Sequence, residues 1–179
     1  MILTIRLHRV LREAVRTPYR NLVTRATGAA VRDRIEAELA GGDWHTALLD
    51  FSEVELLDFS CADEIVAKLL LGPASAGRAL VLSGVREAQR ETLEHVLTHH
   101  RLAVLARFDD GEKPEPLGCL TADARAAFRA LRDGEGADAR ELAARLDWPA
   151  ARAEAALEEL ARQRLVRPAA GRFQPLALP

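Results

Sequence analysis

Aromatic residues and cysteines are scarce in this chain. Phe, Trp and Tyr make up only 4% of the 179 residues, so leucine, valine, isoleucine and alanine must fill the interior. The two cysteines, Cys61 and Cys119, lie in different segments without CxxC spacing. This excludes a disulfide framework and gives no indication of a zinc site. We therefore expect a protein of the reducing cytoplasm.

Long apolar runs and a strong net charge are also missing. The longest apolar run, around 65–71, is interrupted by Lys68 and is far shorter than the about 20 residues that cross a bilayer. Residues 2–7 alternate apolar and polar side chains, unlike the apolar core of a signal peptide. The net charge of −2 argues against non-specific nucleic-acid binding as the main task. No membrane partner is expected.

The first 110 residues alternate strand-like and helix-like segments. Strands are expected at 2–7, 46–51, 78–83 and 102–107, with a further extended stretch within 10–15 or 21–25. Helices are expected at 27–39, 61–71 and 86–100. The run at 46–51 shows little alternation, so we expect it to be the central strand. This order predicts an α/β domain over 1–110, with a mixed sheet flanked by helices.

A second, smaller domain is expected over 118–179. A polar break with Gly111, Pro114 and Pro116 precedes it. The expected elements are helices at about 121–132, 138–146 and 149–163, then a hairpin formed by 164–168 and 172–176. Three helices and a hairpin predict a winged helix, an α+β domain.

The segment from Ala47 to Leu70 resembles the central segment of STAS domains, the fold of anti-sigma factor antagonists. It resembles more closely a STAS-like subgroup of unassigned function, in which D-F-S-x-V ends a strand and S-x-A-D-E-[LI] opens a helix. Asp50–Val54 and Ser60–Ile65 fill these two motifs. The resemblance extends over about residues 1–107. It implies a bacterial regulatory adaptor that docks a protein partner, such as an anti-sigma-like kinase, by partner switching.

The same resemblance directs attention to the start of the helix at 61–71. In phosphorylated members of the wider family, the acceptor is the second serine of a D-S-S-G motif, and Ser60 occupies that place. Phe59 replaces the first serine and Cys61 replaces the glycine. The resemblance therefore makes Asp58, Ser60, Cys61 and Asp63 the candidate partner-binding residues, with Ser60 as a possible phosphoacceptor.

Helix capping offers a second interpretation of Ser60. Ser60 as N-cap and Asp63 three residues later approximate a capping box, in which each side chain satisfies a backbone donor. A phosphate on Ser60 would gain from the helix dipole, but Asp58, Asp63 and Glu64 would repel it. Capping is therefore favoured over phosphorylation.

Two other groups could carry chemistry. Asp50 and Asp58 follow a buried strand, where α/β proteins place acid/base or metal sites. No histidine, nucleophile or glycine-rich phosphate loop adjoins them, so capping or turning the chain explains them better. His95 and His99 have the i, i+4 spacing of a metal-binding helix, but the glutamate of that motif is missing. We assign no catalytic residue, no metal ligand and no cofactor.

DNA binding remains an alternative for the second domain. Its third helix starts with alanines around Arg152 and Glu154, which are poor readers of base edges. From residue 118 onward, ten arginines face nine acids. The candidate phosphate contacts are Arg152, Arg164, Arg167 and Arg172. We therefore favour protein interaction or homodimerisation, with a DNA-binding transcriptional regulator as the alternative and an enzyme last.

Overall fold

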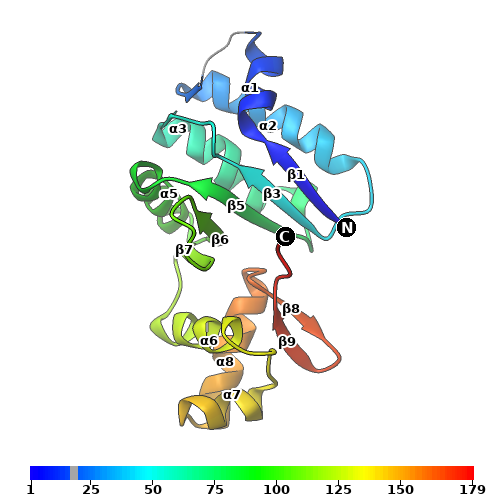
Figure 1. Ribbon diagram of the computed structural model, residues 1–179, viewed down its shortest axis with the longest axis vertical. Helices are drawn as coiled ribbons and strands as arrows, with labels where there is room; N and C mark the ends of the chain where they lie inside the picture. Colours follow the sequence, from blue (N-terminus) through cyan, green and yellow to red (C-terminus); the bar gives the residue numbers. More distant parts are fainter. Residues whose placement is uncertain (17–19) are drawn as a thin grey trace. The chain divides into compact units, whose positions relative to one another are not determined.

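The computed structural model describes residues 1–16 and 20–179, which form two compact units, Met1–Cys119 and Leu120–Pro179. The first unit is built on a five-stranded sheet (Figure 1). In spatial order its strands are β1 (Ile2–Arg6), β3 (Thr46–Asp50), β5 (Ala79–Val85), β6 (Ala103–Phe108) and β7 (Glu115–Gly118). The first four are parallel and β7 is antiparallel to β6. The predicted α/β class with a mixed sheet is confirmed.

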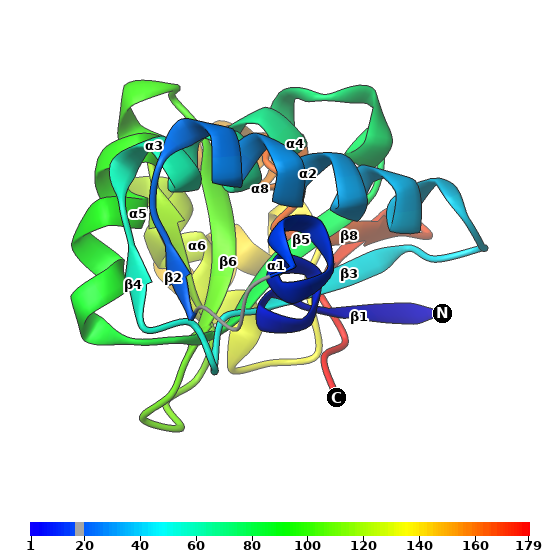
Figure 2. The same ribbon diagram turned by 90° about the horizontal axis from the view of Figure 1, so that it is seen from above.

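The helices of the first unit pack against the sheet (Figures 1 and 2). They are α1 (Leu7–Val15), α2 (Arg25–Ala40), the consecutive segments α3 (Phe59–Ala62), η1 (Asp63–Ala67) and α4 (Lys68–Leu71), and α5 (Glu87–His99). A 3₁₀ turn, η2 (Pro73–Ser75), follows α4, and a short parallel ladder joins β2 (Asn21–Leu22) to β4 (Leu56–Leu57). Strand residues such as Ile5, Leu49 and Leu82 share one hydrophobic core with Ile35 and Leu93 of the helices.

The structure decides one expectation for the N-terminal half and corrects another. Of the two places expected for a further extended stretch, 21–25 contains β2. Residues 10–15 belong to helix α1, because Leu7, Val10 and Leu11 recur at helical spacing and are buried in the core. β3 is not the central strand, since β5 occupies the middle of the sheet. The reason is β7, which adds a strand at the far edge, where Pro116 is tolerated.

The helix expected at 61–71 starts at Phe59 and is interrupted by the π-helical turn η1. Such a turn fits one more residue than a regular helix into the same place, and it commonly marks a functional region. Here all five residues of η1 are buried, including Asp63 and Glu64. The π turn therefore brings two successive acids into the protein interior.

The second unit contains three helices and a hairpin. They are α6 (Ala122–Arg132), α7 (Ala139–Leu146), α8 (Ala150–Arg162) and the antiparallel strands β8 (Val166–Ala169) and β9 (Arg172–Pro175). A single bridge pairs Ala137, which precedes α7, with Phe173 of β9. Asp138 and Glu141 form a reciprocal capping box at α7. Among the described residues, no helix of either unit has the length and apolar character that crossing a membrane requires.

The extent of the sheet predicts where the first unit can be cut. Leu117 of β7 is fully buried, and burying a leucine contributes about 1.5–3 kcal/mol. A fragment of residues 1–119 should therefore unfold cooperatively in urea, and a fragment of residues 1–111 should be less stable by about that amount. Equal midpoints and slopes for the two fragments would show that β7 is dispensable.

Candidate functional site

The carboxylate of Asp58 holds the start of α3. Its Oδ1 accepts hydrogen bonds from the N–H of Cys61 (2.8 Å) and from the hydroxyl of Ser60 (2.9 Å). Its Oδ2 accepts a third from the N–H of Thr24, the N-cap of α2 (3.0 Å). Burial of Asp58 opposes ionisation, but these hydrogen bonds outweigh it and lower the pKa of the carboxyl group. Asp58 thus caps α3 and ties it to α2.

The predicted capping box of Ser60 and Asp63 is wrong. α3 begins one residue earlier, with Asp58 as its N-cap, which places Ser60 inside the first turn. The carboxylate of Asp63 is bound instead to side chains of α2 and of the end of α5. The half-buried Ser60 donates its hydroxyl to Asp58. A phosphoryl group on this oxygen would adjoin an ionised carboxylate, which repels it.

Cys61 is buried at the contact between α3 and α2. Its Sγ donates to the carbonyl oxygen of Thr24 at 3.0 Å. Burial and the neighbouring Asp58 raise the pKa of the thiol to about 12. Opposite it stands Gly28 of α2, where an added Cβ would lie 2.9 Å from the Cα of Cys61. Cys61 is therefore a packing residue with an unreactive thiol.

Glu64 is the most deeply buried acid of the region. It is 2% exposed, yet three cations reach its carboxylate. Arg25 lies at 2.8 Å and Lys68 at 2.5 Å, and Arg32 forms a third ion pair. Burial opposes ionisation of Glu64, but these cations outweigh it and lower the pKa. Glu64 is thus a buried, ionised link between α2 and η1.

Asp63 extends this link to α5. Its Oδ2 accepts from Arg25 at 2.7 Å and its Oδ1 lies 2.6 Å from Nε2 of His100. Burial opposes ionisation of Asp63 as well, but the hydrogen bonds with Arg25 and His100 outweigh it and lower the pKa of the carboxyl group. The sequence marked Asp63 as a candidate site residue. It did not predict that Arg25, Glu64 and His100 would lie around it. We call the following residues the ionic cluster: Arg25, Arg32, Asp63, Glu64, Lys68 and His100.

Exposed apolar side chains surround the capped start of α3. Phe59, the first residue of α3, is 39% exposed, and Leu56 of β4 is 58% exposed. Val23, which follows β2, is 39% exposed. Because β2 and β4 pair in parallel and their leucines 22 and 57 are buried, strand alternation turns Val23 and Leu56 to the opposite, outer side.

Two histidines of α5 complete this surface. The ring of Phe59 lies edge-on to His95, with ring centroids 5.1 Å apart, and edge-on to His99 at 6.4 Å. Both histidines are exposed. We call the five residues the Phe59 patch: Val23, Leu56, Phe59, His95 and His99. It lies directly beside three of the four residues that the sequence marked for partner binding, Asp58, Ser60 and Cys61.

The other candidate chemical groups serve the structure. Asp50 accepts a hydrogen bond from the N–H of Ser52 at 2.9 Å, so it turns the chain after β3 as the sequence predicted. His95 and His99 contact Phe59. Within residues 1–16 and 20–179, no three histidine, cysteine, aspartate or glutamate side chains are grouped so that they could hold a metal ion.

Arg152, the first of the predicted phosphate contacts, is engaged within the second unit. Its Nε and Nη2 donate to the two carboxylate oxygens of Asp123 at 2.8 and 2.7 Å. Its guanidinium also stacks over the ring of Trp148, 4.3 Å from the centroid. The Arg152 charge thus joins α8 to α6 and to the turn before α8.

The remaining three arginines are placed differently from one another. Arg172 binds Glu141 at 2.6 Å and the carbonyl oxygen of Gly136 at 3.2 Å. Arg164 is half-buried, and this burial lowers the pKa of its guanidinium. Arg167 is exposed on β8. The structure therefore does not gather the four predicted arginines into one exposed basic surface.

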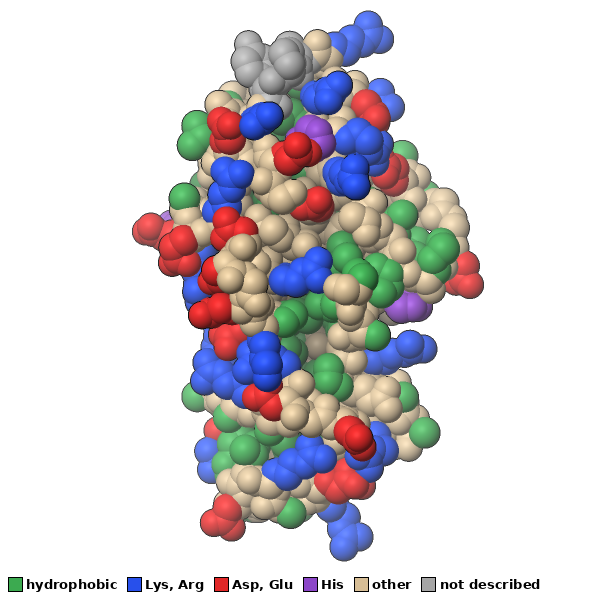
Figure 3. All heavy atoms as spheres, in the orientation of Figure 1, with side chains coloured by type: hydrophobic (Ala, Val, Ile, Leu, Met, Phe, Trp, Pro, Cys, Tyr) green, Lys and Arg blue, Asp and Glu red, His purple; other side chains and the backbone are tan. Residues whose placement is uncertain are grey.

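A groove of 360 Å³ lies between α7, α8 and the hairpin of the second unit. It is lined by Asp138, Ala139, Arg140, Glu154, Leu157, Glu158, Gly171 and Phe173. Three acids face a single arginine here, with Leu157 and Phe173 as the apolar part. Acidic and basic side chains are also interspersed over the face of the molecule drawn in Figure 3. The groove is thus acidic where a DNA-binding surface would need cations.

A comparison of the chain with protein-family models, curated proteins and solved structures finds no match in any of the three. What the protein does is therefore inferred from its own residues.

Proposed function

We propose that this protein is a non-enzymatic regulatory adaptor whose first unit docks a protein partner through the Phe59 patch. The observation that carries the proposal is the position of the exposed apolar residues. Among the described residues, five large apolar side chains are exposed, Met1, Val23, Leu56, Phe59 and Leu71. Three of these five belong to the Phe59 patch. Exposed apolar side chains that cluster commonly mark protein interaction sites.

The support beneath the patch favours recognition over catalysis. Asp58 fixes α3 against α2, and the ionic cluster joins η1 to α2 and α5. A surface held in this way loses little conformational entropy on binding. The neighbouring polar groups are already engaged, since Ser60 donates to Asp58 and the Cys61 thiol is buried. We therefore propose a rigid docking surface with no nucleophile.

The resemblance of residues 47–70 to STAS domains supports the same proposal. The resemblance implies partner docking around the start of this helix, and here the same place carries the Phe59 patch. We propose that the first unit is STAS-like and that its partner is an anti-sigma-like kinase. Regulation by phosphorylation of Ser60 fits less well, because the hydroxyl is bound to Asp58. We propose docking without a phosphate switch.

For the second unit we propose a winged helix that binds protein. The order of three helices, the hairpin and the bridge from Ala137 to Phe173 supports this fold. Arg152 and Arg172 are neutralised by carboxylates, and Glu154 and Glu158 line the groove beside α8. These charges speak against DNA as the ligand. Homodimerisation is one form that the protein interaction can take.

The docking proposal predicts that two substitutions abolish partner capture. The variant Leu56→Glu/Phe59→Glu places charges where an interface must be desolvated, so binding should fall at least tenfold. Leu71→Glu is the matched control, because Leu71 is also exposed but lies outside the patch. The three proteins are compared by quantitative pull-down from the source organism, and any candidate kinase is purified for calorimetry.

The expected result is one protein that the wild type and Leu71→Glu retain and the double variant loses, with unchanged melting temperatures. The complex should respond little to salt. Equal capture by all three proteins would refute docking at the patch. Binding of a DNA duplex with a steep loss of affinity at higher salt would instead favour the transcriptional regulator.

A further inference from the structure

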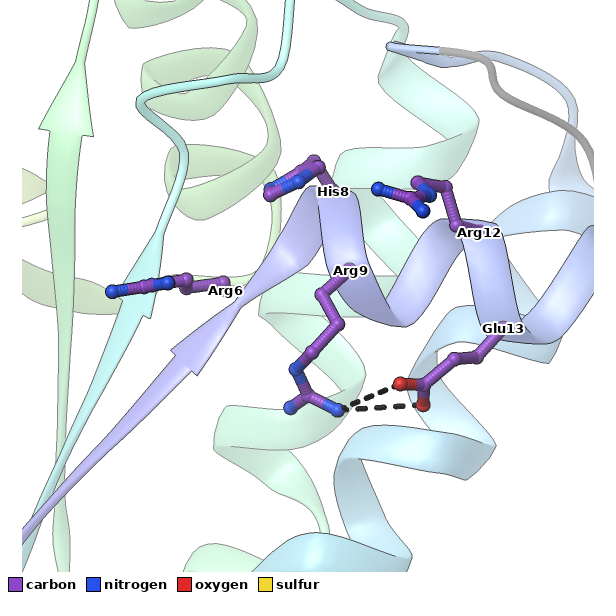
Figure 4. Close-up of a pocket in the computed structure, with 5 residues that line it drawn as sticks. All are labelled: Arg6, His8, Arg9, Arg12 and Glu13. Atoms are coloured by element: carbon purple, nitrogen blue, oxygen red, sulfur yellow. Dashed lines mark hydrogen bonds and ion pairs between the residues drawn. The ribbon is translucent and has the colours of Figure 1, made fainter.

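A pocket of 390 Å³ opens where β1 runs directly into α1. Its walls are Arg6, His8, Arg9, Arg12 and Glu13 (Figure 4). Every one of these side chains is basic or acidic. The volume falls within the range of about 300–1,000 Å³ that holds small ligands. Neither the Phe59 patch nor the groove of the second unit shares a residue with this pocket.

The acids near the pocket already have partners. Arg9 binds Glu13 at 3.1 Å and Glu38 of α2 at 2.8 Å. Nδ1 of His8 lies 2.5 Å from the carboxylate of Glu53. Glu13, Glu38 and Glu53 are thus paired with Arg9 or His8 and not with Arg6 or Arg12.

Arg6 and Arg12 are left without such partners. Both are exposed, and the described part of the chain offers neither of them a hydrogen bond or an ion pair. In Figure 4 the side chain of Arg12 extends from α1 on the same side as His8, and that of Arg6 extends from the end of β1; both point away from the bond between Arg9 and Glu13. The pocket therefore presents two unmatched guanidinium groups.

Two guanidinium groups suit an anion with several oxygens. Arginine binds phosphate and carboxylate through parallel N–H bonds, and a dianionic phosphate gains more from two arginines than a carboxylate does. Arg6 ends β1, and ligands of α/β proteins commonly bind at the carboxyl ends of strands. The positive end of the α1 dipole adds to the attraction, although it would not make a site by itself.

The walls also limit the rest of the ligand. His8 contributes the one aromatic ring of the lining and no aliphatic side chain is part of it, so nothing there would hold an acyl chain. The volume nevertheless exceeds what a bare phosphate ion needs. We infer that this pocket is a binding site for a small phosphomonoester with a polar body of sugar-phosphate size, separate from the partner-docking surface.

The test is a titration of the full-length, ¹⁵N-labelled protein with ribose 5-phosphate, followed by NMR. Parallel titrations use ribose, inorganic phosphate and a short DNA duplex. The variant Arg6→Gln/Arg12→Gln removes both unmatched charges. Arg140→Gln/Arg162→Gln is the matched control, since it removes two exposed charges of the second unit and changes the net charge equally. Melting temperatures establish that both variants are folded.

The expected result is a saturable shift of the amide signals of residues 6–13 with ribose 5-phosphate and none with ribose. The Arg6→Gln/Arg12→Gln variant should bind at least tenfold more weakly, and the control variant less than twofold. Equal weakening by both variants, or no saturable shift, would overturn the site. If inorganic phosphate binds as tightly as ribose 5-phosphate, the assignment to a phosphomonoester is wrong. If the DNA duplex binds more tightly and shifts the same amide signals, the ligand of this pocket is a nucleic-acid backbone instead.

Discussion

Replacing Glu64 with glutamine is expected to lower the free energy of unfolding by about 2–4 kcal/mol. The change removes the negative charge that Arg25, Arg32 and Lys68 share, while the side chain keeps its shape. Loss of one partner of a buried ion pair leaves the others uncompensated. Arg25 and Lys68 are half-exposed and can turn to water. We therefore expect a smaller loss of free energy of unfolding than the about 3–5 kcal/mol that breaking a fully buried ion pair costs. Urea denaturation measures it.

The control is Glu91→Gln, the same change at an exposed position of α5, which should alter the free energy of unfolding by less than about 0.5 kcal/mol. A loss of similar size in both variants would show that the ion pairs of Glu64 do not contribute more to the free energy of unfolding than an exposed carboxylate does. Lys68→Met should cost less than Glu64→Gln, because Lys68 is half-exposed and two other cations remain on the carboxylate.

The pH dependence of stability gives an independent readout of the same cluster. The folded-state pKa values of Asp58, Asp63 and Glu64 lie below their usual values. A depressed carboxyl pKa contributes stability above the unfolded-state pKa of about 4, and this contribution is lost as the pH falls through the folded-state pKa. Glu64→Gln should therefore flatten the loss of stability below about pH 4.3. If the free energy of unfolding falls equally steeply at acid pH in the wild type and in Glu64→Gln, Glu64 is not ionised in the folded protein.

Asp58→Ala is expected to cost about 2–3 kcal/mol, more than Ser60→Ala, which should cost about 0.5–1 kcal/mol. The alanine at position 58 removes the acceptor of three hydrogen bonds, two of them from backbone N–H groups. The alanine at position 60 removes one hydroxyl donor and leaves the cap in place. If Ser60→Ala lowers the free energy of unfolding more than Asp58→Ala does, Ser60 and not Asp58 is the N-cap.

The pair of variants also separates capping from docking. Asp58→Asn keeps an amide oxygen to accept the N–H of Cys61, so it should retain much of the stability that Asp58→Ala loses. If the Phe59 patch docks a partner, Asp58→Ala should weaken binding in proportion to the loss of order at α3. Ser60→Ala should leave binding within about twofold, because the neighbouring apolar side chains remain. If Ser60→Ala weakens partner binding while its free energy of unfolding is unchanged, Ser60 itself contacts the partner.

Local patterns were sufficient to predict most elements. Strands β1, β3, β5 and β6 and helices α2 and α5 were predicted within a few residues, because apolar periodicity and glycine or proline stops are local signals. The three helices and the hairpin of the second unit were predicted on the same grounds. The resemblance of residues 47–70 to STAS domains marked Asp58, Ser60, Cys61 and Asp63 as candidate partner-binding residues, and this stays a prediction.

Contacts between distant segments determined the rest. Asp58 caps α3 through the N–H of Cys61, and its second oxygen ties this cap to Thr24, which is 34 residues away. Glu64 can be buried because α2 supplies Arg25 and Arg32 to its carboxylate. Arg152 is held by Asp123, which lies 29 residues away in the chain. Periodicity determines which residues form an element, but long-range pairing decides whether a charged side chain caps, is buried or stays available to a ligand.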